Sequence, residues 1–231
     1  MKVATYDSRG EVIYTEKHWK ILKAKRERAK EVMSRLKEFG IDSIVYGSVA
    51  RGDVSPSSDV DIFVPYQIPS YRLEIALEDF EILERRIVQA TPNYAIKGEF
   101  VLSDNTTVSF PLVKLKEKEL DFYRFGGCIS YEELLQGKRV PGVDKRLVLI
   151  IPTERGHFEV PVSDVQPSYV AKILGICLDI VKERIRVLER RREVGRTGIF
   201  LCEVVPSFTS FEAYLMEIAK ENPMVRKRLN A

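Results

Sequence analysis

The sequence has little of several residue types that define common classes of protein. Its 3 cysteines are widely spaced and form no Cys-x-x-Cys pair, so we expect neither a disulfide framework nor a zinc site. No signal peptide and no apolar stretch of about 18 residues is visible, which predicts a soluble, cytoplasmic chain without a membrane partner. The net charge is only +3, too small by itself to indicate nucleic-acid binding.

The residues that are abundant fit a globular fold. Of the 231 residues, 45% are hydrophobic and 31% are charged, a composition that excludes intrinsic disorder. A chain of this length can bury a substantial core, in one large domain or two small ones.

The most informative stretch is residues 46–64, which read YGSVARGDVSPSSDVDIFV. A polar loop separates two short apolar runs, and the second run opens with Asp59 and Asp61. Strand side chains alternate between faces, so these aspartates point the same way and lie within reach of one cation. Hard divalent cations such as Mg2+ or Mn2+ take oxygen ligands and usually complete their shell with substrate phosphates. The pair therefore predicts a metal site.

The first apolar run ends at Gly47 and Ser48. Gly47 lets the backbone come close to a ligand, and Ser48 with the amides of a helix starting near Val49 would hold a phosphate. A phosphate site and a metal site together predict chemistry on a nucleoside triphosphate. The alternative is a polar surface loop before an edge strand with two solvated aspartates. It does not explain why the aspartates share a face.

This stretch resembles the DNA polymerase β-type nucleotidyltransferase superfamily, which carries Gly-Ser, a loop of similar length and then Asp-x-Asp. The family often has Arg-Gly inside the loop, matched here by Arg51 and Gly52. The resemblance is specific over residues 41–64, looser out to residue 115 and absent beyond it.

The resemblance implies the fold, the reaction and its participants. We expect an α/β fold with a mixed sheet, in which Mg2+ or Mn2+ binds Asp59 and Asp61. The phosphates of a nucleoside triphosphate would contact Gly47, Ser48 and Arg51. A nucleoside monophosphate would then pass to an acceptor hydroxyl, with release of pyrophosphate.

The third carboxylate of the family pattern is not evident. The best match is the segment Val108-Ser109-Phe110-Pro111, where Ser109 stands in the place of the acid. Serine is a poor metal ligand and a poor base without a partner. Glu99 would take the role if it shared a face with the two aspartates, but it could equally lie on the solvent side of a hairpin strand. Catalytic competence is therefore open at this stage.

Hydrophobic periodicity predicts the order of elements in a nucleotidyltransferase-like domain over residues 1–126. We expect a hairpin at the start, a helix over 17–39, strands over 41–47 and 59–64, a helix from 69 to just before 92, and strands over 94–101 and 107–115.

Residues 127–231 are predicted to form a second domain, a C-terminal α/β and helical extension. A capping-box pattern at Ser130 introduces a helix, and another at Thr209 introduces the last helix. Between them we expect two strands, LVLII and HFEVPV, and one long helix over 167–193. In this superfamily such a domain is expected to supply a wall of the substrate cleft, because clefts between domains are preferred ligand sites.

Basic residues near the end of that long helix are the candidate contact for RNA, through counterion release from phosphates. These residues are Arg190, Arg191, Arg192 and Arg196. A solvated helix face balanced by glutamates explains them equally well. His157 could be a general base, but a structural histidine is the commoner outcome. Arg139 could touch a phosphate or lie in an ordinary loop.

The sequence is therefore compatible with three functions. The first is a metal-dependent nucleotidyltransferase with Asp59, Asp61 and Glu99 as catalytic residues and an unidentified acceptor. The alternative is a non-catalytic nucleotide- or RNA-binding module, which Ser109 favours. The third, an adenylylating partner in a toxin–antitoxin pair, is disfavoured by the length of the chain. The oligomeric state is left open.

Overall fold

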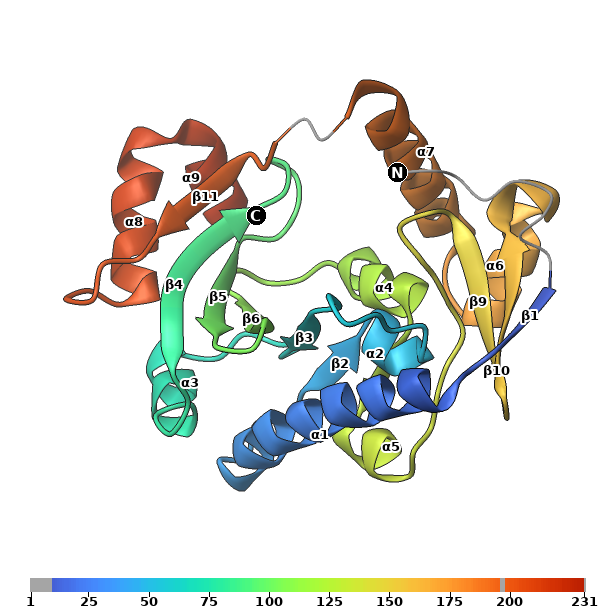
Figure 1. Ribbon diagram of the computed structural model, residues 1–231. Helices are drawn as coiled ribbons and strands as arrows, with labels where there is room; N and C mark the ends of the chain where they lie inside the picture. Colours follow the sequence, from blue (N-terminus) through green and yellow to red (C-terminus); the bar gives the residue numbers. More distant parts are fainter. Residues whose placement is uncertain (1–9, 196–197, 231) are drawn as a thin grey trace. The chain divides into compact units, whose positions relative to one another are not determined.

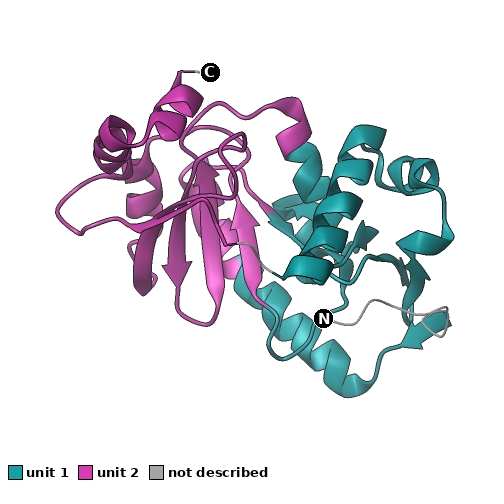
Figure 2. Ribbon diagram, turned by 90° about the horizontal axis from the view of Figure 1, so that it is seen from above, with its two compact units in different colours: residues 1–30, 45–58, 120–197 teal, residues 31–44, 59–119, 198–231 magenta. Residues whose placement is uncertain are grey.

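The computed structural model describes residues 10–195 and 198–230, which form two compact units (Figure 2). Unit 1 is built from residues 1–30, 45–58 and 120–197, and unit 2 from residues 31–44, 59–119 and 198–231. Each unit thus combines three separate segments of the chain. The sequence predicts two continuous domains that meet near residue 126. That boundary stays a prediction.

Unit 1 contains a four-stranded antiparallel sheet in the order β1-β10-β9-β8 (Figure 1). Its strands are β1 (Gly10–Ile13), β8 (Gly142–Val143), β9 (Val148–Thr153) and β10 (Gly156–Pro161). Unit 1 also contains the short helix α2 (Ser48–Arg51), the strand β7 (Cys128–Ser130) and the helix α5 (Tyr131–Leu135). The helix α4 (Glu117–Gly126) has residues in both units. The strand β2 (Ile44–Tyr46) and the helix α1 (Glu16–Glu38) each have residues in both units.

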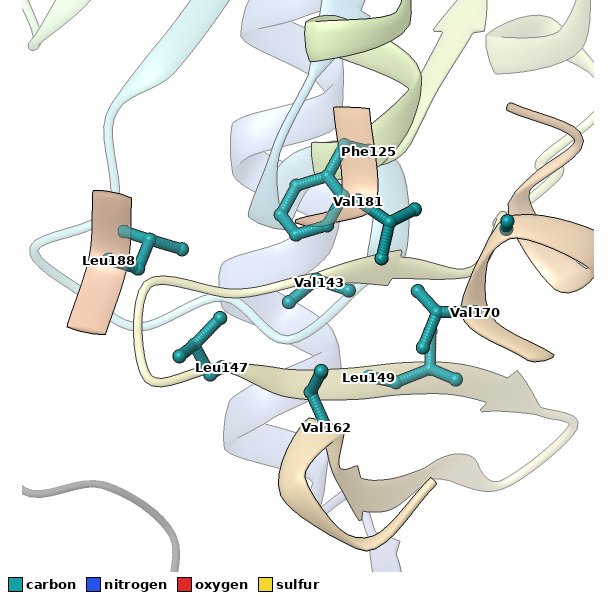
Figure 3. Close-up of a cluster of buried hydrophobic side chains, with 9 residues drawn as sticks. Phe125, Val143, Leu147, Leu149, Val162, Val170, Val181 and Leu188 are labelled. Atoms are coloured by element: carbon teal, nitrogen blue, oxygen red, sulfur yellow. The ribbon is translucent and has the colours of Figure 1, made fainter. Parts of the chain in front are cut away.

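The core of unit 1 lies against the sheet strands β8 and β9. Val143 and Leu149 from these strands gather with Val170, Val181 and further apolar side chains, as Figure 3 shows. The last two come from α6 (Pro167–Leu174) and α7 (Leu178–Val194). Burial of branched apolar side chains from strands and helices is the main favourable contribution to such a unit.

Unit 2 is centred on strands that run in the order β11-β4-β5-β6-β3. They are β3 (Val60–Phe63), β4 (Ile82–Gln89), β5 (Lys97–Leu102), β6 (Thr106–Pro111) and β11 (Leu201–Val204). The pair β3–β6 is parallel, whereas β11–β4, β4–β5 and β5–β6 are antiparallel, so the expected mixed sheet is present. The helices are α3 (Ser70–Ala76), α8 (Phe211–Glu221) and α9 (Pro223–Leu229).

One face of the unit 2 sheet is buried and apolar. Phe100 and Phe110 are fully buried on β5 and β6, and Phe211 of α8 packs on both of them, with ring centroids 5.0 and 5.2 Å away. Along β5, buried residues alternate with half-exposed ones. The other face therefore carries the half-exposed side chains, which matter for the candidate site.

Most predicted elements are present, including the first helix, the strand pair β5–β6 and the capping box at Ser130. The helix expected from residue 69 to just before residue 92 is wrong in its second half. The helix α3 ends at Ala76, and Ile82 onwards forms β4, paired on both sides with β5 and β11. Pairing on both edges outweighs the helical spacing of the apolar residues in this stretch.

The long helix expected over residues 167–193 is also wrong in one respect. It is two helices, and α6 ends at Gly175, which has a φ of 62°. A left-handed residue after the last turn ends a helix, and glycine adopts this conformation without a steric penalty. Cys177, within the span of the expected helix, is exposed and directly precedes α7.

Two further expectations concern the cap of the last long helix and the start of the chain. The last long helix is capped by Ser210, whose side chain accepts a hydrogen bond from the Ala213 amide, and not by Thr209. Residues 1–9, the first part of the expected hairpin, lie outside the described residues, and β1 pairs with β10. Among the described residues, no helix has the length and apolar character needed to cross a lipid bilayer.

Candidate active site

The two aspartates lie at the start of β3 in unit 2. Asp59 is exposed and directly precedes the strand, whereas Asp61 is half-buried within it. Asp61 is paired with Thr107 of β6 in the parallel register, and Val60 and Ile62 between and beyond the aspartates are buried. The alternation of strand side chains therefore directs Asp61 away from the apolar core, as the sequence predicts.

Glu99 lies on the same face of the sheet as Asp61. Glu99 is opposite Ser109 in the β5–β6 register, and Ser109 is opposite Phe63 in the β6–β3 register. Directly paired residues point to the same side of a sheet, and Phe63 is two residues from Asp61. The register thus places Asp61 and Glu99 on one common face of the sheet.

Glu99 is engaged by two cationic side chains of unit 2. Arg86 of β4, directly opposite it, donates from Nε to Oε2 at 2.8 Å, and Lys97 Nζ lies 3.9 Å from Oε1. The charge of Glu99 and its hydrogen bond raise the pKa of Arg86, against an opposing effect of burial. We call Asp61, Lys97, Glu99 and Arg86 the charged face.

Lys97 is the least expected member of the charged face. Burial lowers the pKa of its ammonium, while the negative charges of Glu99 and Asp61 act in the opposite direction. Its ammonium is therefore under the influence of both carboxylates. Sequence reasoning missed Lys97 and Arg86, although the half-exposed positions of β5 alternate from Lys97 to Glu99 and so already imply a shared face.

Ser109 does not replace the missing acid. Its side chain is 2% exposed, and its hydroxyl donates to the Ile62 carbonyl oxygen at 3.3 Å. A buried hydroxyl engaged with the backbone of the neighbouring strand is a packing feature of the sheet. The only acid among its direct cross-strand partners is Glu99.

The predicted phosphate-binding residues lie in unit 1, in the segment 47–53, which we call the glycine loop. Gly47 has a φ of 78°, a conformation that favours glycine, and its N–H donates to the Gly127 carbonyl at 2.8 Å. A side chain at position 47 would meet no atom within 4 Å. Backbone conformation, and not crowding, therefore requires glycine at this position.

Arg51 is held inside unit 1. Its guanidinium donates to both carboxylate oxygens of Asp53 at 2.9 Å and to the Gly126 carbonyl at 2.6 Å. Only 7% of its side chain is exposed. A bidentate arginine–carboxylate pair fixes geometry strongly, so Arg51 orders the glycine loop from within. Its predicted contact with a phosphate stays a prediction.

A second buried arginine also holds the glycine loop. Arg26 of α1 donates to the carbonyl oxygens of Val49 at 3.1 Å, Ala50 at 3.3 Å and Lys138 at 2.6 Å. Burial and the nearby charge of Arg139 lower the pKa of Arg26 to about 10. Arg26 thus holds the backbone of the glycine loop, and Arg51 ties the loop to Gly126.

The remaining candidates of unit 1 have structural contacts. His157 is buried, with Nδ1 2.7 Å from the Tyr14 hydroxyl, and burial lowers its pKa. Arg139 bonds to the carbonyls of Gly156 and Thr153 and lies over the Trp19 ring. These contacts favour the structural interpretation of both.

The candidate RNA contacts lie on α7. Its residues Arg190, Arg191 and Arg192 are exposed, and Arg196 lies outside the described residues.

The donor chemistry of the two aspartates is the type that a hard divalent cation takes. Asp59 and Asp61 offer carboxylate oxygens, the ligand type that Mg2+ and Mn2+ prefer, and Mg2+ is usually bound by one or two carboxylates plus substrate phosphates. Within residues 10–195 and 198–230, no group of three or more His, Cys, Asp or Glu side chains is arranged to hold a metal ion. The protein's own ligand set is therefore small.

Comparison with known families identifies the class of this region. Residues 26–121 match the family model described as a nucleotidyltransferase domain. A nucleotidyltransferase domain is therefore present, consistent with membership of the polymerase β-type superfamily, and the resemblance inferred from residues 46–64 is confirmed. No curated protein and no solved structure shows significant similarity to the chain.

Proposed function

We propose that this protein is a metal-dependent nucleotidyltransferase that moves a nucleoside monophosphate from a triphosphate to an acceptor hydroxyl. The domain match supports nucleotidyl transfer in general. The observation that carries the specific proposal is the common face of Asp61 on β3 and Glu99 on β5, two strands that β6 separates in the unit 2 sheet. The face supplies a metal ligand and a second carboxylate where the sequence pattern alone offers a serine.

In the proposed reaction, Asp59 and Asp61 would hold Mg2+ or Mn2+, and phosphate oxygens of the triphosphate would complete the shell of the ion. Gly47 and Ser48 remain the predicted phosphate contacts of unit 1. The bound ion would neutralise charge on the phosphate oxygens, which is the main catalytic contribution in such transfers. The acceptor oxygen forms a bond to the α-phosphorus, the bond from that phosphorus to the leaving oxygen breaks, and pyrophosphate departs. Glu99 accepts the proton of the acceptor hydroxyl, and Arg86 orients its carboxylate.

The test replaces each aspartate with its uncharged isostere. Asp59→Asn and Asp61→Asn should each abolish pyrophosphate release from a triphosphate in the presence of Mg2+, because the ion loses a charged ligand. Asp42→Asn is a matched control, since Asp42 is an exposed surface carboxylate paired with Lys37. Thermal melting in metal-free buffer should be nearly unchanged in all three. Wild-type turnover by either Asp59→Asn or Asp61→Asn contradicts the mechanism.

Assays with a panel of acceptors should decide which class of second substrate receives the nucleotide. It should contain RNA oligonucleotides, protein hydroxyls and small alcohols, because the acceptor class is not fixed by the charged face. RNA is included because Arg190, Arg191 and Arg192 are exposed on α7. Their replacement by Ala should weaken RNA binding and reduce its salt dependence if they contact phosphates.

The second candidate function is a module that binds a nucleotide without transferring it. Ser109 favours it, because the family position of the third carboxylate holds a buried hydroxyl. Calorimetry with triphosphate and Mg2+, combined with a search for pyrophosphate, separates the two. Saturable binding without pyrophosphate across the whole panel identifies the module.

A further inference from the structure

The chain has two histidines, and both contact Tyr14 in unit 1. The His18 ring of α1 stacks on the Tyr14 ring, with centroids 3.6 Å apart and ring planes inclined by 27°. Tyr14 is itself buried, and its hydroxyl lies 2.7 Å from Nδ1 of His157 on β10. The stack on a buried ring therefore restricts the orientation of the His18 side chain.

His18 contacts the glycine loop through a hydrogen bond. Its Nε2 lies 2.8 Å from the carbonyl oxygen of Gly52. A carbonyl oxygen can only accept, so Nε2 carries the proton and donates it. The N–H of Gly52 donates in turn to the Ser48 carbonyl at 2.7 Å. Gly52 is therefore held at its carbonyl by His18 and joined at its amide to Ser48, one of the predicted phosphate contacts.

The surroundings of Gly52 explain why a side chain from another segment matters here. Gly52 has a φ of 109°, a conformation that favours glycine. A Cβ at this position would lie 2.7 Å from Cδ of Arg139 and 3.3 Å from the Tyr14 hydroxyl. The position thus requires glycine, the residue with the greatest backbone freedom. The hydrogen bond from His18 restricts that freedom at the end of the loop nearest to α1.

Arg26 holds the same loop from the same helix in a different way. It lies eight residues after His18, about two helical turns, and so on the same side of α1. Arg26 is 7% exposed and donates to the carbonyls of Val49, Ala50 and Lys138, so its replacement threatens the fold itself. His18 is half-buried, and its donor can be removed while the ring is kept. His18 therefore allows the position of the loop to be tested separately from folding.

We propose that His18 is a positioning residue for the triphosphate, which acts through Gly52 to fix the backbone of Ser48 for phosphate contact. This inference rests on the proposed function, because it assumes that Gly47 and Ser48 bind phosphates. A loop already held in its bound conformation loses less entropy when the ligand binds, and this raises affinity. The loss of one hydrogen bond of ordinary strength changes an equilibrium constant by about threefold to tenfold.

The experiment measures the dissociation constant of inorganic tripolyphosphate with Mg2+, by calorimetry on the full chain. This probe carries no base, so the base preference of the site does not affect the result. His18→Phe keeps an aromatic ring on Tyr14 and removes the donor, so it should raise the dissociation constant about threefold to tenfold. His18→Gln lacks the ring but carries an N–H at a similar distance from the backbone, so it should stay within about twofold of wild type.

Val181→Ala is the control for a simple loss of stability, because it removes packing from the apolar core of unit 1. It should lower the melting temperature and leave the dissociation constant unchanged at a temperature where every variant is folded. If His18→Phe does not fold, His18→Leu takes its place. An unchanged constant in the variant without a donor overturns the role of His18. Equal weakening in Val181→Ala, or weakening in His18→Gln but not in His18→Phe, overturns it as well.

The phosphate site of the proposed function is tested in the same assay. The double variant Gly47→Val with Ser48→Ala removes the hydroxyl and forces a β-branched residue into a φ of 78°. A wild type that does not bind tripolyphosphate, or binding that this double variant leaves unchanged, overturns the phosphate site. Binding that the double variant weakens and His18→Phe leaves unchanged overturns the positioning role alone. The two failures are therefore distinguishable.

Discussion

The glycine loop of unit 1 and the charged face of unit 2 use charged side chains in opposite ways. At the glycine loop, buried Arg26 donates to backbone carbonyls, and buried Arg51 donates to the Asp53 carboxylate and to the Gly126 carbonyl. On the charged face, Arg86, Lys97 and Glu99 interact side chain with side chain and stay half-exposed. The first arrangement fixes a backbone conformation. The second leaves charge accessible for a ligand.

The largest expected difference between the two regions follows from their ion pairs. The pair Arg51–Asp53 has side chains only 7% and 12% exposed, whereas in Arg86–Glu99 the arginine is 33% exposed. Arg51→Met should lower the free energy of unfolding by about 3–5 kcal/mol, because Asp53 is left as a buried unpaired charge. Arg86→Met should cost less, because Arg86 is more exposed than Arg51, and Glu99, itself 13% exposed, keeps the Lys97 ammonium 3.9 Å away.

Denaturant unfolding of both variants measures this difference directly. Arg51→Lys is an informative addition, because lysine keeps the charge and loses the bidentate geometry. Equal losses of stability in Arg51→Met and Arg86→Met would remove the distinction between a structural and an accessible set of charges.

A smaller effect is expected from packing on the apolar side of the unit 2 sheet. A Cβ at Gly98 would lie 2.5 Å from the Phe110 ring and 2.9 Å from Phe211. Gly98→Ala should therefore cost about 1–3 kcal/mol through overpacking. Gly126→Ala in unit 1 is the matched control, since its Cβ would meet nothing within 4 Å.

Thermal melting of the two glycine variants provides the comparison. Adding Phe211→Leu to Gly98→Ala should recover part of the loss, because neighbouring core residues couple. An unchanged melting temperature in Gly98→Ala would mean that the Phe110 and Phe211 rings move to make room for the added methyl group. The packing of α8 on the sheet would then not limit the size of the side chain at position 98.

The smallest effect concerns the pH dependence of unit 1. Burial lowers the pKa of His157 in the folded chain below its ordinary value. At a pH between the folded and unfolded pKa values, the unfolded chain binds the proton and the folded chain does not. Stability should therefore fall as the pH drops from about 7.5 to about 5.5. His157→Asn should reduce this fall, since asparagine does not titrate.

The melting temperatures of wild type and His157→Asn at the two pH values measure this contribution. A difference of a few degrees between their pH responses is expected. Identical responses would show that protonation of His157 does not contribute to stability in this range.

The sequence predicted the parts of the site that belong to one continuous motif. Asp59, Asp61 and Gly47 could be placed because strand alternation and backbone conformation act within a few residues. The position of Glu99 relative to Asp61 could not be predicted, since it depends on the register through β6. Arg86 was assigned to a helix, and only pairing of β4 with both neighbours makes it a partner of Glu99.

The segmented construction of unit 2 has a consequence for how the chain matures during synthesis. The neighbour of β4, strand β11, and the aromatic cover of the sheet, Phe211 in α8, both come from residues 198–231. The ribosome makes them some 80 residues after the family-matched stretch ends at residue 121. Until then one edge of β4 and the Phe100–Phe110 surface stay uncovered. Translation of the last part of the chain therefore completes a unit whose candidate metal ligands, Asp59 and Asp61, were made long before.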